Sequence, residues 1–187
     1  MSFPPKSIEG TRVRLRSPGI EDVFDIYEKY AQDPEVTRFM IWDPHESIEV
    51  TRDFMGRCNE AWETGKGHRA WVIEAVEDGA LLGMMGFHYV ERHSIEIGYV
   101  LARDYWGQGY TTAALKILIN EAFATSTVDR VQAYCDVENP GSSRVMEKSG
   151  MSLEGTLRGY MKRPHLKPKL RDCLMYAILR EDWEKSV

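Results

Sequence analysis

The chain has 187 residues, of which 43% are hydrophobic and 28% are charged, and its net charge is −5 at pH 7. This size and composition suit one globular domain over residues 1–187 with a core of its own. The acidic balance argues against nucleic-acid binding, which depends on neutralising phosphates. No apolar run reaches the roughly 20 residues that a membrane-spanning helix needs, and the first ten residues lack the apolar core of a signal peptide. We therefore expect a cytoplasmic protein that does not act at a membrane.

The apolar pattern predicts the elements in chain order. A strand over residues 11–17 is followed by amphipathic helices over 20–32 and 47–65, with the loop 39–46 between them. Next come strands over 68–77, 80–91 and 94–102, the first two joined by a tight turn at 77–79. A helix behind residue 109, a strand over 128–137, a short helix over 139–150 capped by Gly150, and strands over 151–161 and 169–179 complete the chain.

This order indicates the fold class. Strands joined by hairpins and followed by a strand–helix–strand crossover predict an α+β protein. Its mixed, mostly antiparallel sheet would have about seven strands, with about four helices on its faces. The crossover is where such a sheet tends to open a ligand crevice.

Three cysteines, Cys58, Cys135 and Cys173, lie far apart in the sequence. Their odd number, with no CxxC pair and no His/Cys cluster, predicts free thiols in a reducing compartment and no metal site. Because Cys135 falls inside a predicted strand, we expect it to be part of the core and not a nucleophile.

The stretch from Gly98 to Phe123, GYVLARDYWGQGYTTAALKILINEAF, runs from a strand through Gly107 and Gly109 into a helix. The first N–H groups of a helix have no internal partner, and the helix dipole makes that end positive. Glycines allow a close approach to these groups, so a diphosphate fits this geometry. A Walker loop is excluded because no lysine occurs before Lys116, and the dinucleotide fingerprint would need a glycine at Thr112.

Two motifs resemble the GNAT family of N-acetyltransferases. YVLARDYWGQGYTTAAL is similar to motif A, with Trp106, Gly109 and Thr111 at the positions of its Q/R-x-x-G-x-G/A loop. ENPGSSRVMEKSGM is similar to motif B, and both motifs, with MIWDPHESIEVTRDFM, resemble the RimJ/RimL branch that acetylates the N-termini of ribosomal proteins. The resemblance covers nearly the whole chain.

The resemblance implies acetyl-CoA as the acetyl donor, without a metal. It implies that the strand 94–102 is bulged and diverges from the strand 128–137, so that the pantetheine arm lies in the gap. A glycine inside a strand, such as Gly98, independently marks a bulge or a close backbone approach. The implied cofactor-binding residues are Val100, Leu101, Trp106, Gly107, Gln108, Gly109, Tyr110, Thr111, Thr112, Asn139 and Ser142.

Acetyl transfer to an amine requires removal of one proton, and Glu96 is our candidate general base. It lies between two isoleucines, and strand alternation places it on one face with Gly98 and Val100. A surface glutamate is the structural alternative. His88 and His93 are close enough in sequence to serve instead.

A tyrosine that protonates the leaving thiolate usually stands seven residues after the motif B asparagine, and here that position is Met146. Ser142 is the nearest hydroxyl by the family pattern, and its alternative role is a helix cap. A CoA thiolate is a good enough leaving group that no acid is strictly required. A backbone N–H near Leu101 could hold the thioester oxygen.

The acceptor side is less defined. By resemblance, Trp42 and its loop wall the substrate site, although a lone aromatic can also simply fix a loop to the core. Asp43 and Glu46 could attract a cationic amine. The stretch 158–171 has six basic residues and no acidic one, which fits either a solvated loop or contact with an acidic partner or a ligand phosphate.

Three functions remain open. The first is acetylation of a protein N-terminal alanine or serine by a RimJ-like enzyme, as a monomer or a homodimer. The second has a small amine, such as an antibiotic or a polyamine, as the acceptor. The third, a non-catalytic acyl-CoA-binding module, is supported only by Met146.

Overall fold

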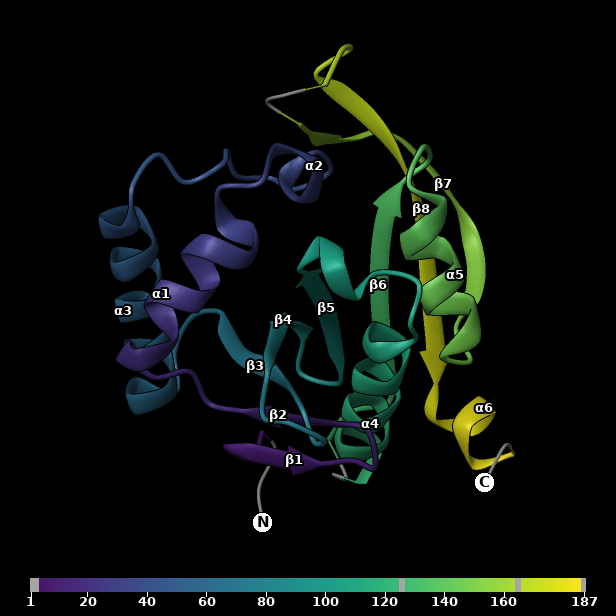
Figure 1. Cartoon of the computed structure of the whole chain (residues 1–187). Coiled ribbons are helices and arrows are strands. Elements are labelled where there is room, and N and C mark those ends of the chain that lie inside the picture. Colours follow the sequence, from purple (N-terminus) through teal and green to yellow (C-terminus); the bar gives the residue numbers. More distant parts are fainter. Residues whose placement is uncertain (1–3, 125–126, 164–165, 186–187) are drawn as a thin grey trace.

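The computed structural model of the chain describes residues 4–124, 127–163 and 166–185. Its strands are β1 (Ser7–Glu9), β2 (Val13–Arg16), β3 (Arg69–Ala75), β4 (Leu81–Glu91), β5 (Ser94–Leu101), β6 (Arg130–Asp136), β7 (Ser152–Lys162) and β8 (Leu170–Leu179). Its α-helices are α1 (Val23–Ile26), α2 (Pro34–Thr37), α3 (Ile48–Thr64), α4 (Tyr110–Ala124), α5 (Pro140–Lys148) and α6 (Arg180–Glu184) (Figure 1).

The strands form one mixed sheet in the order β1-β2-β3-β4-β5-β6-β8-β7. Every neighbouring pair is antiparallel except β5 and β6, which are parallel. This arrangement confirms the α+β fold class and the mostly antiparallel sheet. The hairpin turn is also confirmed, because Gly79 has a φ of +73° and the Ala75 N–H donates to the Ala80 oxygen.

Two features of the N-terminal part differ from the sequence prediction. Strand β1 is an extra strand of three residues, too short to produce a detectable alternation. The predicted helix 20–32 is divided into a 3-10 turn (Ile20–Asp22), α1, and a π-helical turn (Tyr27–Ala31). Pro34, expected only to follow that helix, opens α2 as its first residue, with the Asp33 side chain accepting a hydrogen bond from the Glu35 N–H.

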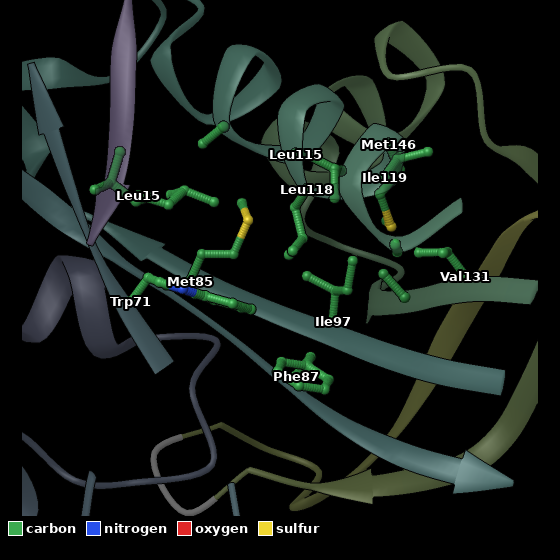
Figure 2. Close-up of a cluster of buried hydrophobic side chains, with 14 of the residues drawn as sticks. Leu15, Trp71, Met85, Phe87, Ile97, Leu115, Leu118, Ile119, Val131 and Met146 are labelled. Carbon is green, nitrogen blue, oxygen red and sulfur yellow. The ribbon is translucent and has the colours of Figure 1, made fainter. Parts of the chain in front are cut away.

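The sheet separates two clusters of buried apolar side chains. On one face, α4 and α5 pack Leu115, Leu118 and Met146 against Ile97 and other sheet residues (Figure 2). The cluster on the other face is formed by α1, α3 and the remaining sides of β3 and β4. Complete burial of a leucine side chain contributes about 1.5–3 kcal/mol relative to exposure, so both faces stabilise the sheet on which the site is built.

Strands β5 and β6 diverge soon after they meet. Their pairing covers only Ser94–Glu96 on β5 and residues 130–132 on β6. Beyond Glu96, β5 continues to Leu101 and β6 to Asp136 without pairing to each other. The predicted gap between these two strands is therefore confirmed. Among the described helices, none combines the length and apolarity needed to cross a membrane.

Candidate active site

The glycine loop before α4 has the backbone geometry of an anion cradle. Gly107 and Gly109 have φ values of +73° and +82°, which side-chain-bearing residues rarely adopt. The Ala113 N–H donates to the Gly109 oxygen at 3.0 Å, which is the first hydrogen bond inside α4. The N–H groups of residues 110–112 therefore precede the helical ladder and are available to a ligand.

Side chains of this loop hold it in place. The Trp106 indole donates to the Leu101 oxygen at 2.8 Å, and the Gln108 amide donates to the Asp104 oxygen at 2.8 Å. Arg12, which the sequence analysis missed, donates to the Gln108 oxygen at 3.0 Å and stacks over the Tyr110 ring at 4.8 Å. Trp106 and Gln108 thus shape the loop, and the cradle itself is made of backbone.

We expect Gly109→Ala to weaken acetyl-CoA binding by about tenfold, because the left-handed conformation costs a residue with Cβ about 1–2 kcal/mol. The added Cβ would also lie 3.3 Å from Arg12 Nη1 and displace the loop. Calorimetric titration measures the affinity. Gly56→Ala is the matched control, because Gly56 lies within α3 with nothing within 4 Å of an added Cβ. Equal affinities for the two variants would contradict the cradle.

The edge of β5 that faces the gap has backbone groups that β6 does not pair, although the Leu101 oxygen accepts the Trp106 indole N–H. The Ala102 N–H donates to the Leu82 oxygen at 2.8 Å. Because alternate residues of a strand direct their backbone N–H and C=O groups to the same neighbouring strand, the backbone groups of Val100 and Gly98 also point toward β4. The backbone groups of Tyr99 and Leu101 therefore face the gap, whereas those of Val100 face β4. Val100 and Leu101 were both predicted to bind the cofactor, but only Leu101 has its polar backbone atoms on the side of the gap.

The predicted bulge at Gly98 is wrong. Gly98 pairs in register with Gly86, and the only shift between β4 and β5 falls between Tyr89 and Glu91. A Cβ on Gly86 would collide with His68, whereas a Cβ on Gly98 would meet nothing within 4 Å. Gly98 therefore leaves open space on its face of β5, and the divergence of the strands requires no bulge there.

Asn139 and Ser142 meet at the start of α5. Asn139 is the helix cap, because its Oδ1 accepts the Ser142 N–H at 3.2 Å, so the cap role considered for Ser142 is wrong. The Ser142 hydroxyl instead lies 2.8 Å from the Tyr99 hydroxyl. Burial raises the pKa of Tyr99 well above its usual range, so its proton stays in place at neutral pH. Met146, which cannot donate a proton, is fully buried.

We expect Ser142→Ala to lower kcat by about tenfold if this hydroxyl pair protonates the departing thiolate. The effect is modest because a thiol near pKa ~8.5 leaves readily. Ser143→Ala, which removes the neighbouring hydroxyl that bonds the Pro140 oxygen, is the control. Steady-state thiol release measures both variants, and a Ser142→Ala enzyme as fast as the control would remove Ser142 from the chemistry.

Glu96 lies where the gap opens. Its side chain is nearly buried, and its Oε2 accepts a hydrogen bond from the Gln132 amide at 2.9 Å. His88 Nε2 lies 3.7 Å from Oε1. His93 lies at the turn between β4 and β5, where its carbonyl accepts the Asp129 N–H. Of the two histidines considered as alternatives, only His88 adjoins the carboxylate.

Trp42 is half-buried and packs on the cluster formed by α1 and α3. Its ring centroid lies 5.2 Å from that of His45, whose Nδ1 lies 2.8 Å from Thr51 Oγ1. Trp42 thus packs against the face of the sheet to which Glu96 and Val100 belong. Asp43 and Glu46 lie in the same loop and are exposed.

Three further residues that the sequence analysis did not name lie on the face of the sheet that carries Glu96. Tyr134 and Tyr160 make an edge-to-face contact with ring centroids 5.1 Å apart, and Arg163 lies over the Tyr134 ring at 6.0 Å. Burial, and then the Glu96 carboxylate, raise the pKa of Tyr134 to about 12. Alternation along β6 was the available signal for Tyr134. The sequence contains no comparable signal for Tyr160 or Arg163, because an irregularity of β7 places them on this face.

The cysteines behave as expected from the sequence. All three are free and buried. Burial raises the pKa of Cys135 to about 11, so its thiol is protonated at neutral pH and unsuited to nucleophilic attack. Within the described ranges, no group of three or more His, Cys, Asp or Glu residues is placed to hold a metal ion.

Comparisons with known proteins agree with this geometry. The model of the acetyltransferase (GNAT) domain matches residues 12–152. The chain is 30% identical over 174 residues to the uncharacterised N-acetyltransferase p20 of Bacillus licheniformis, covering 92% of this chain and 95% of that one. The crystal structure of a GNAT-family acetyltransferase from Bacillus anthracis superposes with a TM-score of 0.81 at 27% identity, covering 94% of this chain and 99% of that one.

A shorter similarity points to a particular reaction. The ribosomal-protein-serine acetyltransferase of Escherichia coli strain K12 is 33% identical over 84 residues, which is 44% of this chain and 47% of that protein. The family and the cosubstrate follow from the matches that cover most of the chain. The chain belongs to the acetyltransferase (GNAT) domain family and is an acetyl-CoA-dependent N-acetyltransferase.

Proposed function

We propose that the enzyme acetylates a protein N-terminal amine, on alanine or serine, with Glu96 as general base. The observation that carries this proposal is the nearly buried Glu96 carboxylate at the point where β5 and β6 separate. The similarity to the Escherichia coli ribosomal-protein-serine acetyltransferase supports the choice of acceptor. An α-amino group, with a pKa near ~8, also needs less activation than a lysine near ~10.4.

The reaction follows from the positions of the groups. Glu96 takes a proton from the ammonium acceptor, directly or through a water molecule, and the neutral amine attacks the thioester carbon. The N–C bond forms as the C–S bond breaks, and the Leu101 N–H on the gap edge stabilises the charge on the carbonyl oxygen. The nitrogen, which is positively charged after the attack, then loses its second proton. The departing CoA thiolate gains a proton from the Ser142–Tyr99 hydroxyl pair or from solvent, and the released proton replenishes that donor.

Binding of acetyl-CoA is assigned to three parts of the chain. The N–H groups of residues 107–112 hold the diphosphate, since the loop exposes backbone and α4 adds its dipole. The β5 edge at Tyr99 and Leu101 pairs with the pantetheine arm. The Asn139 amide still has two donors after its oxygen caps α5, and these face the same arm.

A thiol-release screen tests the acceptor. Purified enzyme and acetyl-CoA are mixed with peptides that begin with Ala, Ser, Gly or Pro, and in parallel with polyamines and aminoglycosides. We expect release with the Ala and Ser peptides, and mass spectrometry places the acetyl group on the α-amine. Turnover of the small amines alone would replace this proposal with the small-amine function, and the absence of thiol release with every acceptor tried would indicate a binding module.

A further inference from the structure

Arg163 is a buried cation with unused hydrogen-bond donors. The residue is 4% exposed, and its Nε and Nη1 have no hydrogen-bond partner among the described residues. Contact with the Tyr134 ring offsets part of the hydration that this buried guanidinium loses, but no described residue accepts a hydrogen bond from Nε or Nη1. The backbone of Arg163 is well anchored, since its N–H donates to the Lys169 oxygen at 2.8 Å. This combination is typical of a group that waits for a ligand.

The buried acidic side chain at the end of β6, Asp136, is already paired. Asp136 accepts two hydrogen bonds from Arg171, at 2.8 and 2.9 Å, and Arg171 also contacts Glu138 at 2.9 Å. Arg171 is thus a buried arginine with a structural role. Arg163 differs from it in having no such acidic partner at Nε and Nη1, although both belong to the basic stretch 158–171.

The position of Arg163 relates it to the acceptor. Ala133 and Cys135 face α4, so Tyr134 faces the opposite side of the sheet, together with Glu96 and Gln132. Arg163 lies over the Tyr134 ring at 6.0 Å, and the Glu96 carboxylate also acts on Tyr134, so all three lie on this side of the sheet. Arg163 is on the acceptor side of the sheet and not on the side of α4, where the CoA diphosphate is proposed to bind.

We propose that Arg163 binds an anionic group of the acceptor, a carboxylate or a phosphate, while Glu96 receives the amine. This inference rests on the proposed function and narrows its substrate class. Tyr134 lies two positions beyond Gln132 along β6, so the anionic group lies about 7 Å or more from the amine. An extended peptide spans about 3.3–3.6 Å per residue, so an acidic side chain on the second or third residue of the acceptor fits. Arginine suits this role because its planar donors match both anions.

The test uses matched peptides with amidated C-termini, so that the side chain is the only acidic group. Ser-Asp-Ala-Ala and Ser-Ala-Asp-Ala are each compared with their Asn counterparts. We expect kcat/KM to be at least tenfold higher for one or both of the Asp peptides with the wild-type enzyme, mostly through KM. Arg163→Gln should abolish this difference and leave the rate with Asn peptides and the affinity for acetyl-CoA unchanged.

Two variants separate binding from folding. Lys162→Gln removes a charge from the exposed neighbour on the same hairpin and should keep the Asp preference. Arg163→Lys keeps the charge and should retain part of the preference, even if the glutamine variant folds poorly. Equal rates for Asp and Asn peptides with the wild-type enzyme, or an Arg163→Gln variant that loses both equally, would overturn the proposal.

The anion site at Arg163 can be tested even if the acceptor is not a peptide. If peptides fail and small amines react, the N-terminal function is wrong, but the anion site is still tested by an ω-amino acid against its own amide. A preference for the acid that Arg163→Gln removes supports the site for a free carboxylate. No preference overturns it for small acceptors as well. A phosphoserine peptide against its serine counterpart distinguishes phosphate from carboxylate as the bound anion.

Discussion

Replacing Glu96 by Gln should lower kcat by about 100-fold or more while acetyl-CoA still binds with wild-type affinity. The amide keeps the size of the side chain and its contact with Gln132 but cannot accept a proton, and loss of a general base typically costs 10²–10⁴ in rate. Steady-state thiol release with a peptide that begins with Ser measures kcat, and calorimetry measures the affinity for acetyl-CoA.

The control for this variant is Glu91→Gln, which makes the same change on an exposed glutamate of β4. It should match the wild type in both measurements. His88→Asn is informative as a third variant, because His88 Nε2 lies 3.7 Å from the Glu96 carboxylate and an imidazole can accept a proton. Full activity of Glu96→Gln with loss of activity in His88→Asn would transfer the base role to the histidine.

Replacing Asp136 by Asn should lower the free energy of unfolding by about 3 kcal/mol. The Asp136 side chain is fully buried and Arg171 nearly so, and removing one member of a buried pair leaves the other charge uncompensated. We take the lower end of the usual range because Glu138, which is more than half exposed, still contacts Arg171. Urea unfolding measures the change.

The same pair makes a prediction about acid stability. Burial is the largest single effect and opposes ionisation of Asp136. The hydrogen bonds from Arg171 and from the Glu138 N–H, with the nearby positive charges, together outweigh it and hold the pKa of the carboxyl below its usual value. The stabilisation is therefore complete above the unfolded pKa of ~3.9 and is lost as pH falls through the lower folded pKa. The difference between wild type and Asp136→Asn should shrink as pH falls below about 4.

Asp129→Asn is the comparison for both measurements. Its partner Arg180 is partly exposed, and the Asp129 side chain is 58% exposed. An exposed pair of this kind contributes roughly 0–1 kcal/mol. Equal losses for the two asparagine variants would show that burial of Asp136 is not what makes its ion pair matter.

The sequence predicts the sheet well because its strands are continuous apolar runs or alternating runs that stand between turn residues. The seven longer strands, α3 with its Gly65 end and α5 with its Gly150 end all follow from such local signals. Strand β1, the π-helical turn at 27–31 and α6 do not, since each has five residues or fewer and is held by packing or by chain geometry. The bulge expected at Gly98 came from a general association of glycine with bulges, which the pairing with Gly86 overrides.

The site divides in the same way. The glycine loop and Glu96 are visible in the sequence because loop chemistry and strand alternation are local. Tyr160 and Arg163 are not, because β7 has two more residues than β8 between its pairs at Leu157 and Met161. This irregularity, with Gly159 at a φ of +58°, sets which side of the sheet the end of β7 presents. No local sequence pattern in residues 152–163 predicts this irregularity.

The three-residue contact between β5 and β6 gives the sheet an open seam in its interior. The wings on either side of it, β1–β5 and β6–β8, are each internally antiparallel and are joined here by little backbone pairing. In the proposed binding mode, the amide-bearing arm of the cosubstrate would pair with Tyr99 and Leu101 as a temporary ninth strand. Occupancy would then couple directly to rigidity: the loaded enzyme should resist local opening along the seam, and release of CoA should relax it.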